Sequence, residues 1–455
     1  MNESTTYTKY IFVICAIIFL VSCGTIDIDP LPNWEISDNV ILINHEEDQA
    51  TFTITNTGNI PLNWEVKSLD KFIIINPFSG KILPGESVTS EIKIFKSELP
   101  EGIYKSQLIL DTDQNLNRGL MVDIISFKEA KWLLNTGIVD AEYDRDNDRI
   151  IALSDQNSLL IIDPQNQTIS NIDLGMPGVR VSLSPDSNTA VVGHIAALSY
   201  VNLKTSTIIK QIGLPFEIFD LVMGPKSWVY ISQLKREFYN LYNINIDTEE
   251  QGWSYSVIVD NQSRLKAHPS GKFIFAANTF VSPSNVDKID ITQGKASGNY
   301  STPYHGDYPF AGDLWVADDG SQFFSRGGYA FTISDNRTFD MTNIGRLHSD
   351  HYFSTIAHSS KNGKIYGIYN SRIRHPAHNV TADILAKYNF SYQLLEEVKL
   401  PGFLSIDSYG QYQILNSHAE FSFFNNEGNK YYIISKSAPE YNTSPQWAII
   451  SIPTL

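Results

Sequence analysis

A repeat in the C-terminal three-quarters of the chain constrains its fold more than any other feature. A turn followed by an apolar strand recurs seven times, and the second residues of these turns are 40, 39, 44, 49, 43 and 66 positions apart. These residues are Arg149, Thr189, Trp228, Lys272, Ser321, Lys364 and Lys430. Except for the last, such spacings are typical of propeller blades, each a four-stranded sheet of about 40 to 50 residues.

A second series with the same period supports the same fold. The apolar strand of the first series is followed by a further strand, and the second series marks the end of that next strand. Its members are Ile162-Asp163, Val201-Asn202, Tyr242-Asn243, Ile289-Asp290, Ile333-Ser334 and Tyr388-Asn389. The polar side chains in it are expected to cap the turn into each blade's outer strand. Two interleaved series with one period predict a seven-bladed β-propeller in residues 129–455.

The long sixth gap bears on the number of blades, and the two ends of the propeller region bear on how the ring closes. Two insertions, Ser371–Val380 and Ser408–Phe421, explain the gap, and the alternative is an eighth blade hidden there. The chain ends in a strand, Gln446–Ile452, and the segment Ala130–Asn135 precedes the first blade. Pairing these two segments would close the ring and remove its open edges.

Motifs within two of the blades suggest a family. They are Pro177-Gly178-Val179, Leu183-Ser184-Pro185-Asp186, Ala190-Val191-Val192 and Val201-Asn202-Leu203-Lys204-Thr205, with Ala267-His268-Pro269-Ser270-Gly271-Lys272 in blade four. Blade two, Val179–Leu214, thereby resembles the YVTN or YncE-like propeller repeat. The resemblance implies a binding or scaffold protein and supplies no catalytic residues. The WD dipeptide pattern of WD40 proteins is absent from the sequence.

Residues 34–128 predict a separate small β-sandwich. Seven short strands are expected, at Val40–Asn44, Ala50–Asn56, Leu62–Val66, Phe72–Asn76, Ser87–Phe95, Tyr104–Thr112 and Leu120–Ile125. Turn signals separate them, at Asn56-Thr57-Gly58-Asn59, Pro77-Phe78-Ser79-Gly80, Pro84-Gly85-Glu86 and Pro100-Glu101-Gly102. Seven strands in about 95 residues fit an immunoglobulin-like fold.

Four segments of this region carry a second resemblance. They are Ala50-Thr51-Phe52-Thr53-Ile54, Leu62-Asn63-Trp64, Ile75-Asn76-Pro77-Phe78-Ser79-Gly80 and Glu101-Gly102-Ile103-Tyr104. They resemble the BACON family, modules common in lipoproteins of gut Bacteroidetes. That family has been proposed to bind carbohydrate or mucin, but the resemblance supplies no binding residues. The alternative is a spacer that holds the propeller away from a membrane.

The N-terminus predicts a lipid anchor. The apolar run from Tyr10 to Val21 is shorter than the roughly 20 residues that span a membrane, and it suits a signal peptide. Leu20-Val21-Ser22-Cys23 follows and resembles a bacterial lipobox, which implies cleavage before Cys23 and acylation of that residue. Residues 1–22 are therefore expected to be a signal peptide, residues 23–33 a tether, and the protein an outer-membrane lipoprotein of the cell envelope, periplasmic or surface-facing. An ordinary signal peptide is the alternative.

The cysteine count and the net charge exclude some classes of function, and the aromatic content indicates the fold class. The chain has two cysteines, Cys15 in the signal peptide and Cys23, so the mature protein would lack a free thiol and a disulfide. This excludes thiol catalysis and cysteine-bound zinc. A net charge of -16 argues against nucleic acid as a partner. It also disfavours electrostatic binding to anionic lipid, which leaves the acyl chain as the expected membrane contact. With 12% aromatic residues and no sustained helical periodicity, an all-β protein is expected.

The segments that lead into the innermost strands are expected to line the mouth of the central channel, where ligands usually bind. Those of blades four to six are rich in aromatic and charged side chains. This combination suits sugars, because rings stack on C–H faces while polar groups bind hydroxyls. The predicted ligand-binding residues are Arg264, Tyr304, His305, Asp307, Tyr308, His351 and Tyr352. The predicted function is non-catalytic recognition of a glycan or protein ligand, without a cofactor; loops that merely collect polar residues are the alternative.

Two patterns keep other functions open. His348, Asp350, His351 and His358 could supply metal ligands, which leaves a propeller lyase or hydrolase with a histidine-bound metal as an alternative, although no metal is predicted. Asp144, Asp146, Asp148 and Asp155 alternate like the start of a calcium loop. Because Arg149 stands where such loops need glycine, a blade turn is expected there. An assembly scaffold, the third alternative, predicts an exposed apolar patch.

Overall fold

The computed structural model describes residues 33–113, 117–235, 238–260, 262–279, 281–304, 306–347, 351–369, 382–438 and 444–454. The chain divides between Ser126 and Phe127 into two compact units. Apart from three short 3-10 turns, at Lys96–Glu98, Pro225–Ser227 and Ser360–Asn362, every described element is a strand. The protein is therefore all-β, as predicted. Within the described ranges there is no helix long and apolar enough to cross a bilayer.

The first unit is built from two sheets. One has the order β1 (Trp34–Ile36), β3 (Gln49–Asn56), β7 (Ser87–Ile94) and β5 (Ile73–Asn76). The other has the order β2 (Val40–Ile43), β9 (Arg118–Ser126), β8 (Gly102–Thr112), β4 (Leu62–Ser68) and β6 (Ser79–Ile82). Only the β2–β9 pair is parallel among these described strands. The unit has nine strands where seven were predicted, because β1 and β6 also pair; Ser79-Gly80, expected in a turn, begins β6.

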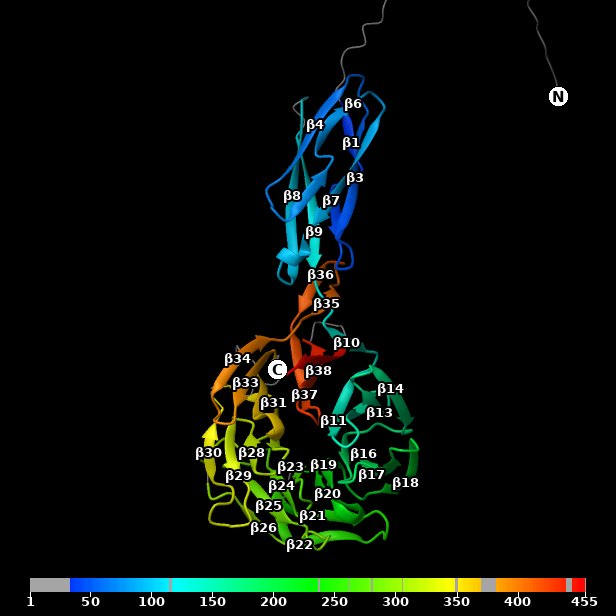
Figure 1. Ribbon diagram of the computed structural model, residues 1–455. Helices are drawn as coiled ribbons and strands as arrows, with labels where there is room; N and C mark the ends of the chain where they lie inside the picture. Colours follow the sequence, from blue (N-terminus) through cyan, green and yellow to red (C-terminus); the bar gives the residue numbers. More distant parts are fainter. Residues whose placement is uncertain are drawn as a thin grey trace, which may run out of the picture. The chain divides into compact units, whose positions relative to one another are not determined.

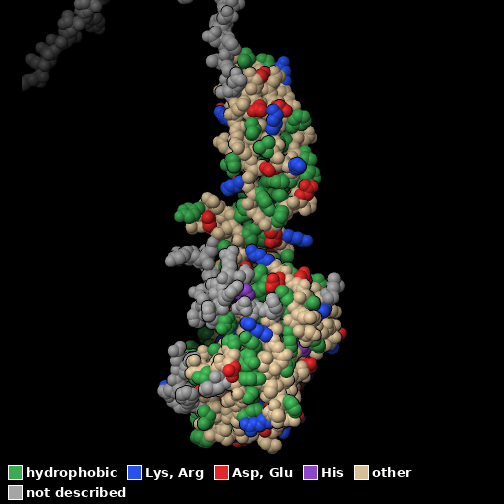
Figure 2. Space-filling model, turned by 90° about the vertical axis from the view of Figure 1, so that its left-hand side faces the viewer, with side chains coloured by type: hydrophobic (Ala, Val, Ile, Leu, Met, Phe, Trp, Pro, Cys, Tyr) green, Lys and Arg blue, Asp and Glu red, His purple; other side chains and the backbone are tan. Residues whose placement is uncertain are grey.

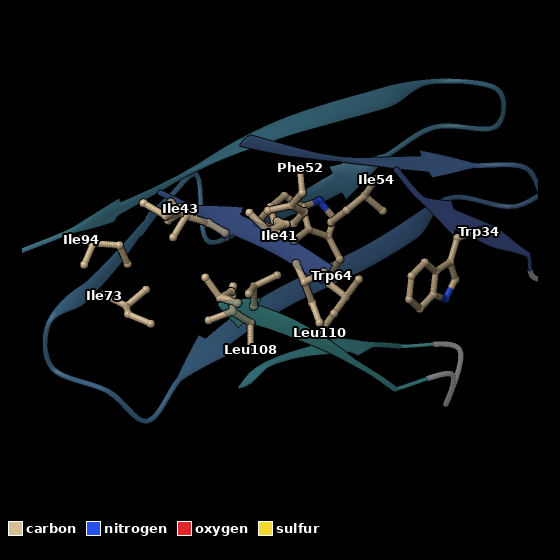
Figure 3. Packing of buried hydrophobic residues seen from close by; sticks show 14 of the residues in the cluster. Trp34, Ile41, Ile43, Phe52, Ile54, Trp64, Ile73, Ile94, Leu108 and Leu110 are labelled. Atoms are coloured by element: carbon tan, nitrogen blue, oxygen red, sulfur yellow. The ribbon is translucent and has the colours of Figure 1, made fainter. Parts of the chain in front are cut away.

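One apolar core joins these two sheets. Phe52 and Ile54 of β3 and Trp64 of β4 belong to the same cluster of buried residues, and Figure 3 shows them converging on the space between the strands. Alternate residues along β7 are buried, which is the period-2 pattern of a strand with one face on a core. The alternation seen in the sequence thus forms an apolar inner face, although some apolar side chains at the intervening positions, such as Val40, Leu42 and Ile74, are exposed.

The second unit contains seven four-stranded antiparallel sheets, which form a ring around a central axis (Figure 1). Blades one to three are β11 (Ile138–Asp144), β12 (Arg149–Ser154), β13 (Ser158–Asp163) and β14 (Thr168–Asp173); β15 (Arg180–Leu183), β16 (Thr189–Gly193), β17 (Ala197–Asn202) and β18 (Thr207–Gly213); and β19 (Ile218–Met223), β20 (Trp228–Gln233), β21 (Phe238–Asn245) and β22 (Gln251–Asp260). Blades four to six are β23 (Arg264–Ala267), β24 (Phe273–Ala277), β25 (Val286–Asp290) and β26 (Asn299–Ser301); β27 (Leu314–Val316), β28 (Gln322–Ser325), β29 (Tyr329–Thr332) and β30 (Asn343–Arg346); and β31 (Phe353–Ser359), β32 (Lys364–Tyr369), β33 (Ile384–Asn389) and β34 (Leu394–Lys399). This arrangement is the predicted seven-bladed propeller.

The seventh blade joins the two ends of the propeller. Its strand order is β37 (Ser417–Phe424), β38 (Lys430–Ser437), β39 (Trp447–Pro453) and β10 (Lys131–Leu134). Strand β10 pairs antiparallel with β39, with Lys131 opposite Ile450 and Leu134 opposite Trp447. The predicted closure of the ring is confirmed. The side-chain amine of Lys131 is fully buried, and it donates to the carbonyl oxygen of Gly402 at 2.6 Å.

Local hydrogen bonds explain the second sequence series. The Oδ1 atom of Asp163 accepts from the backbone N–H groups of Gln165 and Asn166, at 2.9 and 3.0 Å. This is an Asx turn, and equivalent side chains cap the other blades, as predicted. Blade three differs from the prediction: Asn245, not Asn243, caps its turn, and Asn243 is buried inside β21.

The long sixth gap is explained in part by a hairpin. Strands β35 (Phe403–Ile406) and β36 (Tyr412–Leu415) form a small sheet of their own between blades six and seven. The predicted insertion 408–421 was too long at its C-terminal end, because residues 417–421 belong to β37, the innermost strand of blade seven. The other predicted insertion, 371–380, lies outside the described residues.

Burial follows position within a blade. The second strands are buried on both faces, because neighbouring blades pack face to face; β16 and β24 are examples. Core clusters therefore combine residues of adjacent blades, such as Val191 of blade two with Val229 of blade three. On the face that Figure 2 shows, the Asp, Glu, Lys and Arg side chains of the described residues are scattered among polar ones. Such a surface favours solubility.

Candidate binding site in the central channel

The innermost strands of all seven blades enclose a cavity of about 1090 Å³. These strands are β11, β15, β19, β23, β27, β31 and β37. The volume lies at the upper end of the range for small-molecule sites, about 300 to 1000 Å³. The wall is contributed by strands far apart in the sequence, so the ring fold itself creates the cavity.

Bulges decide which side chains the innermost strands turn toward the cavity. In β11, β19 and β31 the pairing register shifts at the second residue of the strand, at Val139, Phe219 and Ser354. All three bulged residues line the cavity. Because a shift of one residue exchanges the two faces of a strand, these bulges set the wall chemistry that follows.

Charged side chains cover the wall on blades one to five. Seven of them form a cluster, namely Asp140, Glu142, Arg180, Asp220, Arg264, Lys266 and Asp313, and Arg145 and Arg326 also line the wall. Asp140 and Glu142 are two residues apart on β11, as are Arg264 and Lys266 on β23, so each pair shares one face of its strand. Salt bridges and backbone hydrogen bonds hold this cluster in place.

The carboxylates of the cluster accept hydrogen bonds from the next blade. Asp140 accepts from the backbone N–H of Val181 at 2.9 Å, and Glu142 from that of Leu183 at 2.8 Å. Asp220 of blade three accepts in the same way from Leu265 of blade four, at 3.0 Å. These bonds link adjacent innermost strands and fix the acids before any ligand arrives, which is the preorganisation that a binding site needs.

Arg264 connects three blades. Its Nη1 lies 3.8 Å from Oδ2 of Asp220, and its Nε lies 3.6 Å from Oδ1 of Asp313. The guanidinium carbon also sits 4.8 Å from the centre of the Phe219 ring. Arg180 approaches Asp220 from the other side, with its Nε 3.5 Å from Oδ1. The cations and anions of this half of the cavity therefore alternate around the wall.

The acidic residues of the cavity wall differ in the direction in which their pKa values are shifted. Burial raises the pKa of Glu142 to about 7, and burial also raises the pKa of Asp140. Burial opposes the ionisation of Asp313 as well, but the positive charges of Arg264, Lys266 and Arg180 outweigh it and lower the pKa of Asp313. Burial alone would lower the pKa of Lys266; four nearby carboxylates, Asp313 first among them, raise it instead. The shifts therefore favour the charged forms of Asp313 and Lys266, whereas the pKa of Glu142 is raised to about 7.

The wall on blades six and seven is polar and aromatic. Tyr352, Phe421 and Phe423 line it together with hydroxyl-bearing residues. The hydroxyl groups of Thr355 and Ser422 are 2.8 Å apart and bridge the two blades. This part of the wall also includes the carboxylate of Glu420 and the imidazoles of His358 and His418, so it combines aromatic rings and hydroxyl groups with a few ionisable groups.

The predicted ligand-binding residues lie in different places. Arg264 and Tyr352 are on the cavity wall. Tyr304 and Tyr308 pack into an aromatic cluster of blade five, with ring centroids 4.7 Å apart, and are not among the residues that line the cavity. Asp307 is exposed and is also not part of the wall.

The remaining predicted positions are outside the cavity wall or outside the structure's described ranges. His351 stacks on Tyr369, with ring centroids 4.7 Å apart. His305 and Cys23 lie outside the described residues. The role of all these side chains in binding stays a prediction. Sequence reasoning missed every charged wall residue of blades one to five except Arg264, although acids and bases at alternate positions of apolar strands, as in Val139-Asp140-Ala141-Glu142, were a visible signal.

The histidine-bound metal considered from the sequence stays untested. His351 precedes strand β31 and His358 lies within it, so the extended chain between them spans roughly 20 Å at about 3.3 Å per residue and a single ion is not expected to bind both. His358 is buried, with Nδ1 2.6 Å from Oδ1 of Asp318. Asp319 also has an oxygen near this pair, within 4.8 Å. His348 and Asp350 lie outside the described residues.

The calcium pattern is a blade turn, as expected. The carboxylate of Asp144 is fully buried and forms a salt bridge with the Nε of Arg149 at 2.7 Å. Oδ1 of Asp148 accepts from the hydroxyl of Tyr143 at 2.9 Å. These oxygens hold the hairpin between β11 and β12.

Comparisons with known proteins give structural neighbours only. No family model matches the sequence, and no curated protein matches it. One similar solved structure is the Kuenenia stuttgartiensis hydrazine synthase, 13% identical, with a TM-score of 0.48 over 72% of this chain and 98% of that one. Another is the β-propeller domain of Cps50 (Swd1) from Myceliophteria thermophila, 9% identical, with a TM-score of 0.49 over 70% of this chain and 99% of that one. Neither similarity bears on function.

Proposed function

We propose that this protein recognises a glycan in the central cavity of its propeller, without chemically changing it, at the bacterial cell envelope. The observation that carries the proposal is the cavity of about 1090 Å³, whose wall combines a fixed cluster of charged side chains on blades one to five with aromatic rings and hydroxyl groups on blades six and seven. A protein ligand that inserts a loop into the same cavity is the alternative.

The wall chemistry supports a sugar. Sugar hydroxyl groups both donate and accept, so they are bound well by carboxylates and guanidinium groups in one site. Asp220 and Arg264 offer this combination at one point of the wall. Trp315 and Tyr352 add aromatic faces against which the C–H face of a pyranose can stack.

Binding to a glycan array tests the proposal. Protein lacking residues 1–23 is expected to bind a limited set of glycans, and titration calorimetry should then give a saturable isotherm. Lys266→Met and Tyr352→Ala should each weaken binding about tenfold or more, because the first removes a charged hydrogen-bond donor and the second an aromatic face from the wall. Tyr409→Ala is the control, since Tyr409 lies on the β35–β36 hairpin and is 87% exposed. Binding that survives both wall substitutions would contradict the proposal.

A specific observation favours a second candidate function, glycoside cleavage. Glu142 has a pKa of about 7, which suits a general acid at neutral pH, and it faces the cavity. In this case purified protein would release reducing sugars from a polysaccharide, and Glu142→Gln would abolish the release while sugar binding remained. Binding without any product over many hours would leave recognition as the function.

The place of the protein in the cell is part of the proposal. The lipobox-like sequence before Cys23 supports an acyl anchor, and the resemblance of the first unit to immunoglobulin-like BACON modules supports a spacer or a second carbohydrate-binding module. Producing bacteria fed an alkyne-tagged palmitate should label the wild-type protein. Cys23→Ala should not be labelled and should leave the membrane fraction.

A further inference from the structure

A second hollow lies on blade three, apart from the central cavity. It has a volume of about 740 Å³ and shares no lining residue with the cavity. The lining residues are Pro215, Phe216, Glu217, Gln233, Leu234, Lys235, Asn240, Trp253 and Tyr255. They come from the segment before β19, the end of β20 with the loop after it, β21 and β22. We call this hollow the blade-three groove.

Two rings that line the groove, Phe216 and Trp253, pack on each other and on the buried ring of Tyr242. Phe216 lies 5.2 Å from Trp253 and 4.9 Å from Tyr242, measured between ring centroids, and Trp253 lies 4.7 Å from Tyr242. Phe216 and Trp253 are half-buried, so each is held by its neighbours while part of it stays accessible. An aromatic surface of this kind loses little freedom when a ligand stacks on it.

A bulge in β22 adds an exposed ring beside these rings. Asn240 pairs with Ile258 and Tyr242 with Trp253, so the four residues of β22 between Trp253 and Ile258 face a single residue of β21. Ser254 anchors the bulge by donating to the carbonyl oxygen of Ala296 at 2.8 Å. Tyr255 follows and is 82% exposed. Bulges often aim a side chain at a functional site.

The groove also contains an unused polar group. The side chain of Gln233 lines it and is only 7% exposed, yet its Nε2 has no hydrogen-bond partner in the described part of the chain. An unpaired buried amide destabilises a protein by about 1 to 3 kcal/mol, so proteins seldom keep one without a reason. Glu217 lines the same groove and is exposed, which provides an acceptor next to this donor.

We propose that the blade-three groove is a second binding site, which takes a neutral saccharide. A pyranose ring stacks on Trp253 and Tyr255 through its C–H face, and its hydroxyl groups bind the amide of Gln233 and the carboxylate of Glu217. Glu217 and the net charge of -16 disfavour an acidic sugar.

The groove chemistry favours a sugar over a peptide. An extended peptide is held mainly by main-chain hydrogen bonds along its length. The groove instead offers the amides of Gln233 and Asn240, the carboxylate of Glu217 and the amine of Lys235 next to aromatic faces, which matches a ring that bears hydroxyl groups. The site does not depend on the central cavity, because no residue is shared.

Affinity electrophoresis tests this inference. The full chain, purified in detergent, is run through native gels that contain galactomannan, xyloglucan, mixed-linkage β-glucan or dextran. At least one of these neutral polysaccharides should retard the wild-type protein. Tyr255→Ala and Gln233→Met should each raise the dissociation constant about tenfold, whereas Tyr409→Ala, which removes an equally exposed tyrosine outside the groove, should not change it.

Gln233→Met separates a binding role from a structural one. Because the Nε2 of Gln233 is unpaired, its replacement by a side chain of similar length should leave the melting temperature equal or higher while the dissociation constant for the sugar rises about tenfold. A lower melting temperature with unchanged binding overturns the inference, as does the absence of retardation in all four gels. Retardation that Tyr352→Ala abolishes and Tyr255→Ala leaves intact would place the sugar in the central cavity and also overturn it.

Discussion

Glu142 on the cavity wall should make the propeller less stable as the pH rises. Its carboxylate accepts the N–H of Leu183 at 2.8 Å, and burial raises its pKa from 4.5 to about 7. Glu142→Gln keeps an oxygen for this hydrogen bond and removes the titration. Between pH 4.5 and pH 7 the folded protein binds more protons at this site than the unfolded chain, so stability falls as the pH rises through this window.

The size of the effect follows from these two pKa values. Their difference corresponds to about 3 kcal/mol once the group is ionised in both states, and about 2.5 kcal/mol of this is lost between pH 5 and pH 8. The second unit spans residues 127–455. At about 2.1 cal/mol/K of unfolding entropy per residue, 2.5 kcal/mol shifts the melting temperature of a unit of this size by about 4 °C.

Thermal unfolding at several pH values measures the effect. The melting temperature of Glu142→Gln minus that of the wild type should rise by about 4 °C from pH 5 to pH 8, because every other titration is common to both proteins. Glu427→Gln, which changes the formal charge equally at an exposed position, should show a difference that does not depend on pH. A flat difference for Glu142→Gln would show that this carboxyl group titrates normally and refute the reasoning.

Three further predictions concern the scaffold. Tyr308→Ala should lower the free energy of unfolding by about 2 to 3 kcal/mol, measured by urea denaturation, because its ring packs on Phe331 at 5.3 Å; normal stability would mean that Tyr308 is free to serve as a ligand residue instead. Lys288→Met should destabilise the protein by about 3 to 5 kcal/mol, because it leaves Asp340, 2.8 Å away, as an unpaired buried charge, and adding Asp340→Asn should recover most of the loss in a double-mutant cycle. Asn202→Ala should reduce stability by about 1 kcal/mol in the same denaturation assay, because two backbone N–H groups lose their partner, and an unchanged midpoint would show that water replaces the cap.

The sequence was informative about the propeller because its signals are local. In blades one, two, four and six an Asx side chain accepts backbone N–H groups two or three residues ahead, as Asp163 and Asn202 do, and such contacts depend on neighbouring residues alone. The closing strand was predictable because the two ends of the propeller region, Ala130–Asn135 and Gln446–Ile452, are both apolar strand segments that can pair and so remove an open edge of the ring. Where two candidates for a cap were close together, as with Asn243 and Asn245, the sequence did not distinguish them.

The cavity was predictable only in outline. Which side chains face the channel depends on the register of each innermost strand, and bulges at Val139, Phe219 and Ser354 change it. A bulge arises from pairing with another strand and has no signature in a single segment. Tyr304 and Tyr308 illustrate the converse, since aromatic residues next to a channel strand were expected to face a ligand and instead fill the space around Phe331.

The strand that closes the ring has a mechanical consequence. Strand β10 is the first element of the propeller, so any pull that arrives from the N-terminal side of the chain acts on it before it reaches blade one. Its pairing with β39, the bond from Lys131 to Gly402 and the packing of Leu134 in the apolar core resist that pull. If the protein is tethered at its N-terminus and loaded through a captured ligand, β10 should peel away first. The ring would then open beside blade seven, and the rate at which the ligand dissociates would depend on the applied force.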